Sequence, residues 1–212
     1  MFQESQDKEY FSLCVHRAKK TYLVWVEQFL DIISENADMN TTLKLNDIGC
    51  NLGQFWKGLK RRDFVNIDYN GFDYEEMYVE EAKNIFPEVS EKFNFLDIEK
   101  TTPPQCDITV CSATLEHMEY LQPSLENMLE STDKLFLLRT FFGEIPLKSI
   151  RMKKNAKSYY NIHQFSFHEV FSSFKRNGFS PKIIRDQYTD SMPRYLDDGI
   201  IRTFYVVMGV RI

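Results

Sequence analysis

The chain of 212 residues has no long hydrophobic run and no excess of positive charge. No apolar stretch approaches the roughly 20 residues that a membrane-spanning helix needs. A net charge of −5 does not favour a broad grip on nucleic-acid phosphates, which requires many lysines and arginines. The opening residues, MFQESQDKEYF, lack the basic and apolar regions of a secretory signal. We therefore expect a cytoplasmic protein whose partners are neither membranes nor nucleic acid.

Cysteine is scarce, and its spacing excludes the common zinc and redox motifs. None of the four cysteines belongs to a CxxC pair, and all lie in or beside apolar segments: Cys14, Cys50, Cys106 and Cys111. This pattern is typical of buried free thiols. Glu116, His117 and Glu119 are of the residue types that bind metals, but their spacing lacks a full ligand set. No metal site is predicted.

Short apolar segments alternate with segments of helix-forming composition. The expected strands are Leu43–Ile48, Phe64–Ile67, Phe93–Leu96, Ile108–Cys111 and Leu135–Leu138, and the expected helices between them are Gln54–Arg61, Asp73–Phe86 and Pro123–Ser131. This alternation predicts βαβ units and a parallel sheet. A helical stripe over Tyr10–Ile33 precedes the sheet. A helix over Phe165–Asn177 and strands over Ser180–Ile184 and Ile201–Val210 follow it, and these last strands are candidates for antiparallel pairing.

Glycine is also scarce, with eight in the chain, yet two lie four residues apart directly behind the first expected strand. The stretch reads Asp47-Ile48-Gly49-Cys50-Asn51-Leu52-Gly53, and its glycines would allow a tight turn and close approach to a ligand. In an open α/β sheet, ligands bind at the carboxyl ends of the strands. The residues behind the next three expected strands are Asp68, Asp97 and the run Ser112-Ala113-Thr114-Leu115-Glu116-His117.

A glycine turn, two successive acids and an LEH ending, in this order and spacing, resemble the class I S-adenosylmethionine-dependent methyltransferases from about Leu43 to Arg139. The resemblance implies an α/β, Rossmann-like fold with a seven-stranded, mostly parallel sheet, helices on both faces and an antiparallel last strand. It implies one domain over residues 1–212. Within it we expect a helical lead-in (1–40), a cofactor-binding core (41–140), a substrate-covering insertion (141–165) and a C-terminal helix with the last two strands (166–212).

The resemblance also implies how S-adenosylmethionine is held. The glycine turn would bind its methionine end, Asp68 its ribose, and Asp97 its adenine amino group, with Ile98 beside the ring. The full set of expected cofactor-binding residues is Asp47, Gly49, Cys50, Asn51, Gly53, Asp68, Asp97, Ile98, Ser112 and Ala113. Asp68 and Asp97 could instead be helix caps or solvated loop acids.

A nicotinamide-binding domain also begins with a strand, a glycine-rich turn and a helix. This chain does not complete G-x-G-x-x-G, because residue 51 is Asn and residue 54 is Gln. An NAD-dependent oxidoreductase is therefore the weaker alternative. A catalytically inactive, cofactor-binding partner subunit is a second alternative, and a homodimer is left open.

The acceptor of the methyl group is expected to be a small polar molecule that is methylated on oxygen. His117 would act as the general base that removes the hydroxyl proton, although it could equally be structural. The segment between Glu144 and Glu169 contains no acid but several basic and aromatic residues. The hypothesis is an anionic acceptor, phosphorylated or linked to a nucleotide or sugar, held by Arg151, Lys153, Lys154, Tyr160 and His163. The alternative is a solvated basic loop.

Overall fold

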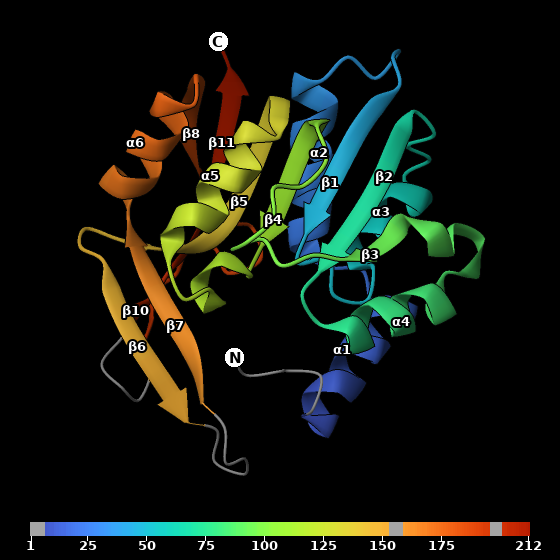
Figure 1. Ribbon diagram of the computed structural model, residues 1–212, viewed down its shortest axis with the longest axis horizontal. Helices are drawn as coiled ribbons and strands as arrows, with labels where there is room; N and C mark the ends of the chain where they lie inside the picture. Colours follow the sequence, from blue (N-terminus) through green and yellow to red (C-terminus); the bar gives the residue numbers. More distant parts are fainter. Residues whose placement is uncertain (1–6, 153–158, 196–200) are drawn as a thin grey trace.

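The computed structural model describes residues 7–152, 159–195 and 201–212. Seven strands of its central sheet follow the order β3-β2-β1-β4-β5-β11-β8, as Figure 1 shows. Pairing is parallel from β3 to β5, whereas β11 is antiparallel to both β5 and β8. The strands are β1 (Leu43–Ile48), β2 (Ile67–Asp73), β3 (Phe93–Phe95), β4 (Cys106–Ser112), β5 (Thr132–Gly143), β8 (Phe179–Arg185) and β11 (Phe204–Arg211). The expected fold class is confirmed.

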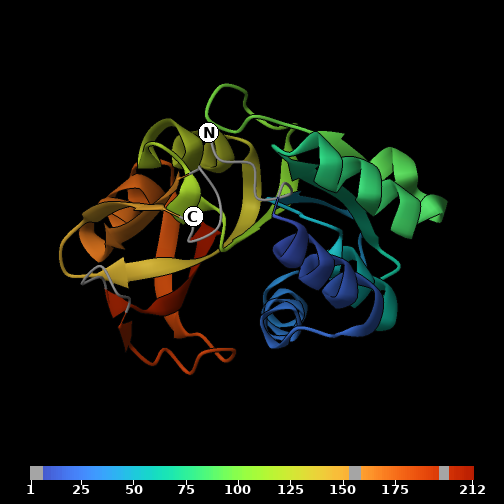
Figure 2. The same ribbon diagram turned by 90° about the horizontal axis from the view of Figure 1, so that it is seen from below.

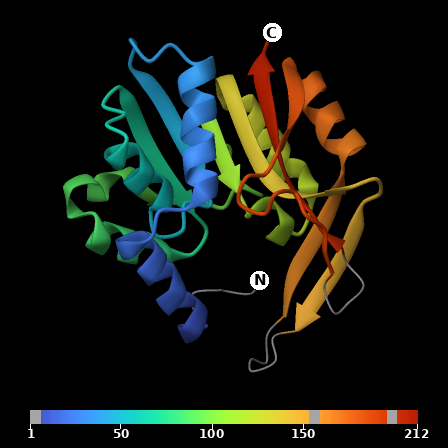
Figure 3. The ribbon, with the colours of Figure 1, turned by 180° about the vertical axis from the view of Figure 1, so that it is seen from behind.

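Helices cover both faces of the sheet because its inner strands are apolar on both sides. Neighbouring β5 residues such as Leu137 and Leu138 are both buried but belong to different hydrophobic clusters. One cluster includes α2 (Val24–Asn36), α3 (Gln54–Arg61) and α4 (Glu76–Ile85), and the other includes α5 (Leu121–Glu130) and α6 (Phe167–Arg176). Figures 1 and 3 show α5 and α6 on one face and α2 on the other. All four cysteines are buried thiols outside any disulfide, as expected.

The expected N-terminal helical stripe is two helices. Helix α1 (Lys8–Lys20) is followed by Thr21, whose backbone is extended, and α2 starts at Val24. The break lets α1 leave the sheet and pack its buried Cys14 and Ala18 against Leu52, in the glycine turn. Helix α1 therefore lies beside the carboxyl end of β1.

The second expected strand is wrong in its bounds. Phe64 is not in a strand, because its N–H closes the end of α3 on the carbonyl of Leu59 at 3.1 Å. Strand β2 starts at Ile67 and runs to Asp73. The strand therefore ends five residues later than Asp68. The acid at its carboxyl end, where ligands bind in such sheets, is Asp73.

The segment expected to be an insertion forms a β-hairpin. Strand β6 (Leu147–Met152) pairs antiparallel with β7 (Tyr159–Ser166), and the end of β7 pairs with β5 through Phe142 and Phe165. A smaller ribbon joins β9 (Arg194–Tyr195) to β10 (Ile201–Arg202). Figures 1 and 3 show α1 and the β6–β7 hairpin projecting from the same end of the sheet, and Figure 2 views the molecule from that end. Two 3-10 helices, Pro87–Lys92 and Leu115–His117, complete the described elements. In the described part of the chain, no helix has the length and apolar character needed to cross a membrane.

Candidate functional site

A cavity of about 480 Å³ lies where β1, β2 and β4 end. Its walls include the residues that follow these three strands, together with side chains of α1 and of β7. This volume falls within the range of small-molecule sites, and its position at the carboxyl ends of parallel strands is where open α/β sheets bind ligands. The cavity is therefore the candidate site.

The glycine turn after β1 forms one wall of the cavity. Gly49 has φ +75°, and a Cβ on it would lie 2.0 Å from the hydroxyl oxygen of Thr114. Only glycine fits there, and its backbone borders the cavity together with Cys50 and Asn51. Gly53 has φ +77° at the start of α3, but a Cβ on it would meet the rings of Phe86 and Phe93. Gly53 thus serves core packing and does not line the cavity.

Asp73 is the acid at the end of β2. Its Oδ2 accepts the backbone N–H of Asn51 at 2.8 Å, and its Oδ1 accepts that of Glu75 at 2.9 Å. These bonds fix the carboxylate between the glycine turn and the residues after β2, at the cavity wall. Each carboxylate oxygen can accept more than one hydrogen bond, so ligand hydroxyls can also bind here.

Asp68, the residue predicted for this role, lies at the opposite end of β2. It is paired in register with Lys44 at the start of β1, and its Oδ1 forms an ion pair with Lys92 Nζ at 2.6 Å. It does not line the cavity. The assignment of Asp68 is therefore wrong, because the strand begins, rather than ends, beside it.

Asp97 is not brought to the cavity either. Its carboxylate accepts the N–H of Glu99 at 3.1 Å and forms an ion pair with Lys100 at 2.8 Å, while its carbonyl closes the following turn. Asp97 therefore stabilises a turn and not the start of a helix, which was one of the two alternatives open from the sequence. Its neighbours Leu96 and Ile98 do line the cavity and supply an apolar wall.

Asp47 is a buried carboxyl group at the floor of the cavity. Burial raises its pKa to about 7, although the hydroxyl of Tyr69 donates to its Oδ2 at 2.9 Å and favours the charged form. The nearby charge of Asp73 raises the pKa further. An incoming cation would reverse this penalty, so the floor is suited to a positively charged ligand group.

Replacing Asp47 by Asn should stabilise the ligand-free protein at pH 8. Because the folded pKa exceeds the unfolded one, wild-type stability is greatest below about pH 4 and falls as the pH rises to 7. Three pKa units correspond to an upper bound of about 4 kcal/mol in the free energy of unfolding. Urea denaturation of both proteins between pH 5 and pH 8 measures this difference in the free energy of unfolding. Asp68→Asn is the control, and parallel pH curves for Asp47→Asn and wild type would contradict the raised pKa.

The end of β4 and the 3-10 helix behind it add a hydroxyl group and an imidazole to the cavity. The hydroxyl oxygen of Ser112 is buried and has no hydrogen-bond partner among the described residues, and it borders the cavity with Ala113, whose φ is +55°. His117 donates from Nδ1 to the carbonyl oxygen of Asn161 at 2.9 Å, since a carbonyl can only accept. The neutral imidazole therefore keeps its lone pair on Nε2.

The predicted substrate residues have different positions. Tyr160 lines the cavity, with its ring 5.9 Å from that of His117. His163 is buried away from the cavity wall, and burial lowers its pKa. The backbone of Arg151 pairs with Tyr160 in the hairpin, but its side chain lies outside the described part. Lys153 and Lys154 also lie outside the described residues. In the described ranges, no group of three or more His, Cys, Asp or Glu side chains is arranged to hold a metal ion.

Several cavity residues were missed. Asp73 could have been found from the alternation of buried Ile67, Tyr69 and Gly71 with more exposed residues, which marks a strand that continues past Asp68. The side chains that α1 and its connection to α2 contribute had no local signal, because their position depends on how α1 packs. The missed residues that line the cavity include Tyr10, Arg17, Trp25, Asp73, Tyr74, Thr114 and Asn161.

Comparison with solved structures decides the fold family. A methyltransferase from Clostridium acetobutylicum, described as S-adenosylmethionine-dependent, superposes with a TM-score of 0.65 at 10% identity over 99% of both chains. A TehB-like S-adenosylmethionine-dependent methyltransferase from Corynebacterium glutamicum gives 0.63 at 13% identity over 99% of this chain and 100% of that chain. This chain has the class I methyltransferase fold. Magnesium protoporphyrin IX methyltransferase from Synechocystis, solved with bound S-adenosylmethionine, gives 0.60 at 17% identity over 88% of this chain and 78% of that chain.

No protein-family model and no curated protein matches the chain. The assignment to the methyltransferase fold therefore rests on topology and shape. The strand order, with its antiparallel β11 between β5 and β8, and the cavity at the ends of β1, β2 and β4 are the features that carry it.

Proposed function

We propose that the protein is an S-adenosylmethionine-dependent methyltransferase that acts in the cytoplasm on a small polar acceptor. The observation that carries the proposal is the cavity at the strand ends of a methyltransferase fold, bordered by the Gly49 turn and by the fixed carboxylate of Asp73. When bound, S-adenosylmethionine supplies an electrophilic methyl group on a positively charged sulfur.

The residues around the cavity fit each part of this cofactor. Asp73 offers a carboxylate to the ribose hydroxyls, and Leu96 and Ile98 offer an apolar wall to the adenine. Asp47 would accept the ammonium group of the methionine end, which would remove the cost of its buried charge. Ser112 has an unused hydroxyl group at the same cavity. The absence of a Cβ at Gly49 leaves room for close backbone approach.

Arg17 is the group that we assign to the carboxylate of the methionine end. It lies on α1, whose buried face contacts Leu52 in the glycine turn, and its side chain lines the cavity. Replacing Arg17 by Met should weaken S-adenosylhomocysteine binding about tenfold, because a charge-assisted hydrogen bond contributes on the order of 1.5 kcal/mol. Titration calorimetry with methylthioadenosine, which lacks the amino-acid carboxylate, is the control and should give the same affinity for both proteins. An equal loss for both ligands would contradict the assignment.

His117 is the proposed general base. Its Nδ1 proton is held by Asn161, so Nε2 can accept the proton of an acceptor hydroxyl as the oxygen attacks the methyl group. Tyr160, beside the His117 ring, would help to orient the acceptor. Residues of α1 and of β7 line the cavity and would exclude part of the water from the reaction centre.

Two alternatives can be separated from the proposal by binding and turnover. An oxidoreductase should be stabilised by NAD rather than by S-adenosylhomocysteine in a thermal unfolding assay. An inactive partner subunit should bind S-adenosylhomocysteine but transfer no label from methyl-labelled S-adenosylmethionine to hydroxylated small molecules. The proposal requires stabilisation by S-adenosylhomocysteine, none by NAD, and label transfer.

A further inference from the structure

Arg202, on the short strand β10, is a guanidinium group packed between aromatic rings. Its Cζ lies 4.6 Å from the ring centre of Phe141 and 4.9 Å from that of Phe204. Burial lowers its pKa. Among the described residues, none forms a hydrogen bond or an ion pair with its side chain. A guanidinium has five N–H donors, and those of Arg202 are left for water or for a ligand.

Among the described residues, two other arginines stack on buried rings, and hydrogen bonds hold both of them. Arg139 lies 3.7 Å from the Phe204 ring and makes two hydrogen bonds to Asp186, at 2.7 and 3.1 Å. Arg211 lies over Phe179 and donates to the carbonyl oxygens of Thr132, Leu129 and Asn177. Arg202 differs from both, so its position is not explained by packing alone.

Charges of both signs surround Arg202. Arg194 is its direct cross-strand partner, and two like charges opposite each other destabilise a β-ribbon. Glu116 attracts Arg202, and its Oε2 accepts the hydroxyl of Thr140 at 2.8 Å. Arg139 is committed to Asp186. An anion beside Arg202 would relieve the repulsion from Arg194.

This arginine adjoins the candidate site. Phe141 and Phe204, against which it packs, form a cluster with Ile162, and Ala113 and Tyr160 pack on that cluster. Ala113 and Tyr160 are also cavity-lining residues, and Tyr160 acts electrostatically on Arg202. Arg202 itself does not line the cavity, but it packs on the same aromatic cluster as two residues that do.

We propose that Arg202 binds an anionic group of the acceptor, a carboxylate or a phosphate, while the hydroxyl to be methylated lies at His117. The proposal rests on the methyltransferase function given above and assigns the anion to a side chain outside the 151–163 segment that the sequence favoured. The rings of Phe141 and Phe204 would lower the local dielectric and strengthen the bidentate contact.

The test uses three probes of matched shape: 4-hydroxybenzoate, phenyl phosphate and the neutral 4-hydroxybenzamide. Each is titrated into the full chain by calorimetry, with and without saturating S-adenosylhomocysteine. We expect at least one anion to bind with a millimolar or lower Kd, and the amide to bind at least about tenfold more weakly. Arg202→Met should weaken the anion about ten- to a hundredfold, and Arg202→Lys less, because lysine keeps the charge without the fork.

Two controls keep the result specific. Lys182→Met removes an exposed positive charge on β8 and should leave all affinities unchanged. Arg202→Met should bind S-adenosylhomocysteine as tightly as the wild type does. If the wild type itself does not bind S-adenosylhomocysteine, that result refutes the proposed function, whereas the anion titrations test the anion site separately. The inference is overturned if neither anion binds, if the amide binds as well as the anions, or if Arg202→Met keeps the anion affinity. If Arg202→Met does not fold, unchanged anion affinity in Arg202→Lys overturns it.

Discussion

Replacing Asp73 by Asn is expected to weaken S-adenosylhomocysteine binding at least a hundredfold. The carboxylate is held by the backbone N–H groups of Asn51 and Glu75 and faces the cavity. A hydrogen bond to a charged acceptor contributes about 1.5 to 3 kcal/mol, and the two ribose hydroxyls would lose two of them. The combined loss of about 3 kcal/mol corresponds to two orders of magnitude in Kd.

Asp68→Asn is the matched control for this variant. Asp68 lies on the same strand but at its other end, where its partner is Lys92. Titration calorimetry should give the wild-type Kd for Asp68→Asn, and circular dichroism should show that both variants are folded. A large loss in Asp68→Asn with little change in Asp73→Asn would restore the assignment made from the sequence and refute the one made from the structure.

Replacing Asp186 by Asn is expected to cost about 3 to 5 kcal/mol in the free energy of unfolding. Asp186 is fully buried and forms a two-point ion pair with Arg139, which is 3% exposed. Although burial alone would raise its pKa, the hydrogen bonds and charge of Arg139 hold the pKa of Asp186 below its ordinary value. The variant would leave Arg139 charged and unpaired in the interior. The melting temperature should fall by roughly 10 °C, at 2 to 4 °C per kcal/mol for a chain of this size.

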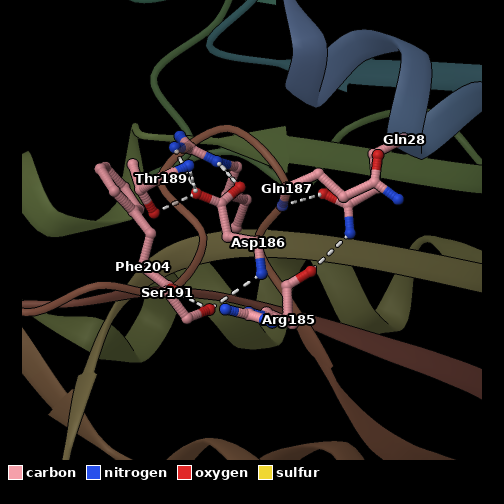
Figure 4. Close-up of polar contacts among 8 residues, drawn as sticks. Gln28, Arg185, Asp186, Gln187, Thr189, Ser191 and Phe204 are labelled. Carbon is pink, nitrogen blue, oxygen red and sulfur yellow. Dashed lines mark hydrogen bonds and ion pairs between the residues drawn. The ribbon is translucent and has the colours of Figure 1, made fainter.

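The ion pair between Arg139 and Asp186 holds the loop that follows β8 in place. Figure 4 shows Asp186 among the residues that tie the loop down: its N–H donates to Ser191 Oγ, which in turn donates to the carbonyl oxygen of Phe204. Gln28 of α2 bonds the backbone of Arg185 and Gln187 on the other side. Losing the pair would release both the loop and the Phe204 ring.

Asp190→Asn is the control for the buried pair. Asp190 forms an ion pair with Arg185, but both side chains are more than half exposed, at 61% and 67%. An exposed pair contributes at most about 1 kcal/mol, and Asn tolerates the positive φ of this position. Equal destabilisation of Asp186→Asn and Asp190→Asn in urea denaturation would contradict the account of the buried pair.

The fold and one half of the site could be predicted from the sequence because their signals are local. The run Leu43–Ile48 is a buried strand followed at once by Gly49, whose positive φ requires glycine. The bounds of β2 were missed because Asp68 interrupts the apolar run on the exposed side of the strand. A strand with one buried face reads as alternation, so a search for continuous apolar runs ends it too early.

The rest of the site depends on contacts between residues far apart in the chain. Arg17 reaches the cavity only because α1 breaks from α2 and packs on Leu52. Arg139 and Asp186 are 47 residues apart in the chain. Arg202 meets Phe141 only because β11 pairs with β5, which places Phe204 opposite Phe141. No spacing or motif encodes such pairs, because they follow from the sheet order.

A crystal structure with bound S-adenosylhomocysteine tests the central claim most directly. We predict that the ribose hydroxyls lie within hydrogen-bond distance of Asp73, the adenine beside Leu96 and Ile98, and the methionine end between Asp47 and Arg17. The sulfur should face the open part of the cavity beside His117. A ribose bound elsewhere, or a ligand that leaves the Asp73 carboxylate untouched, would contradict the account.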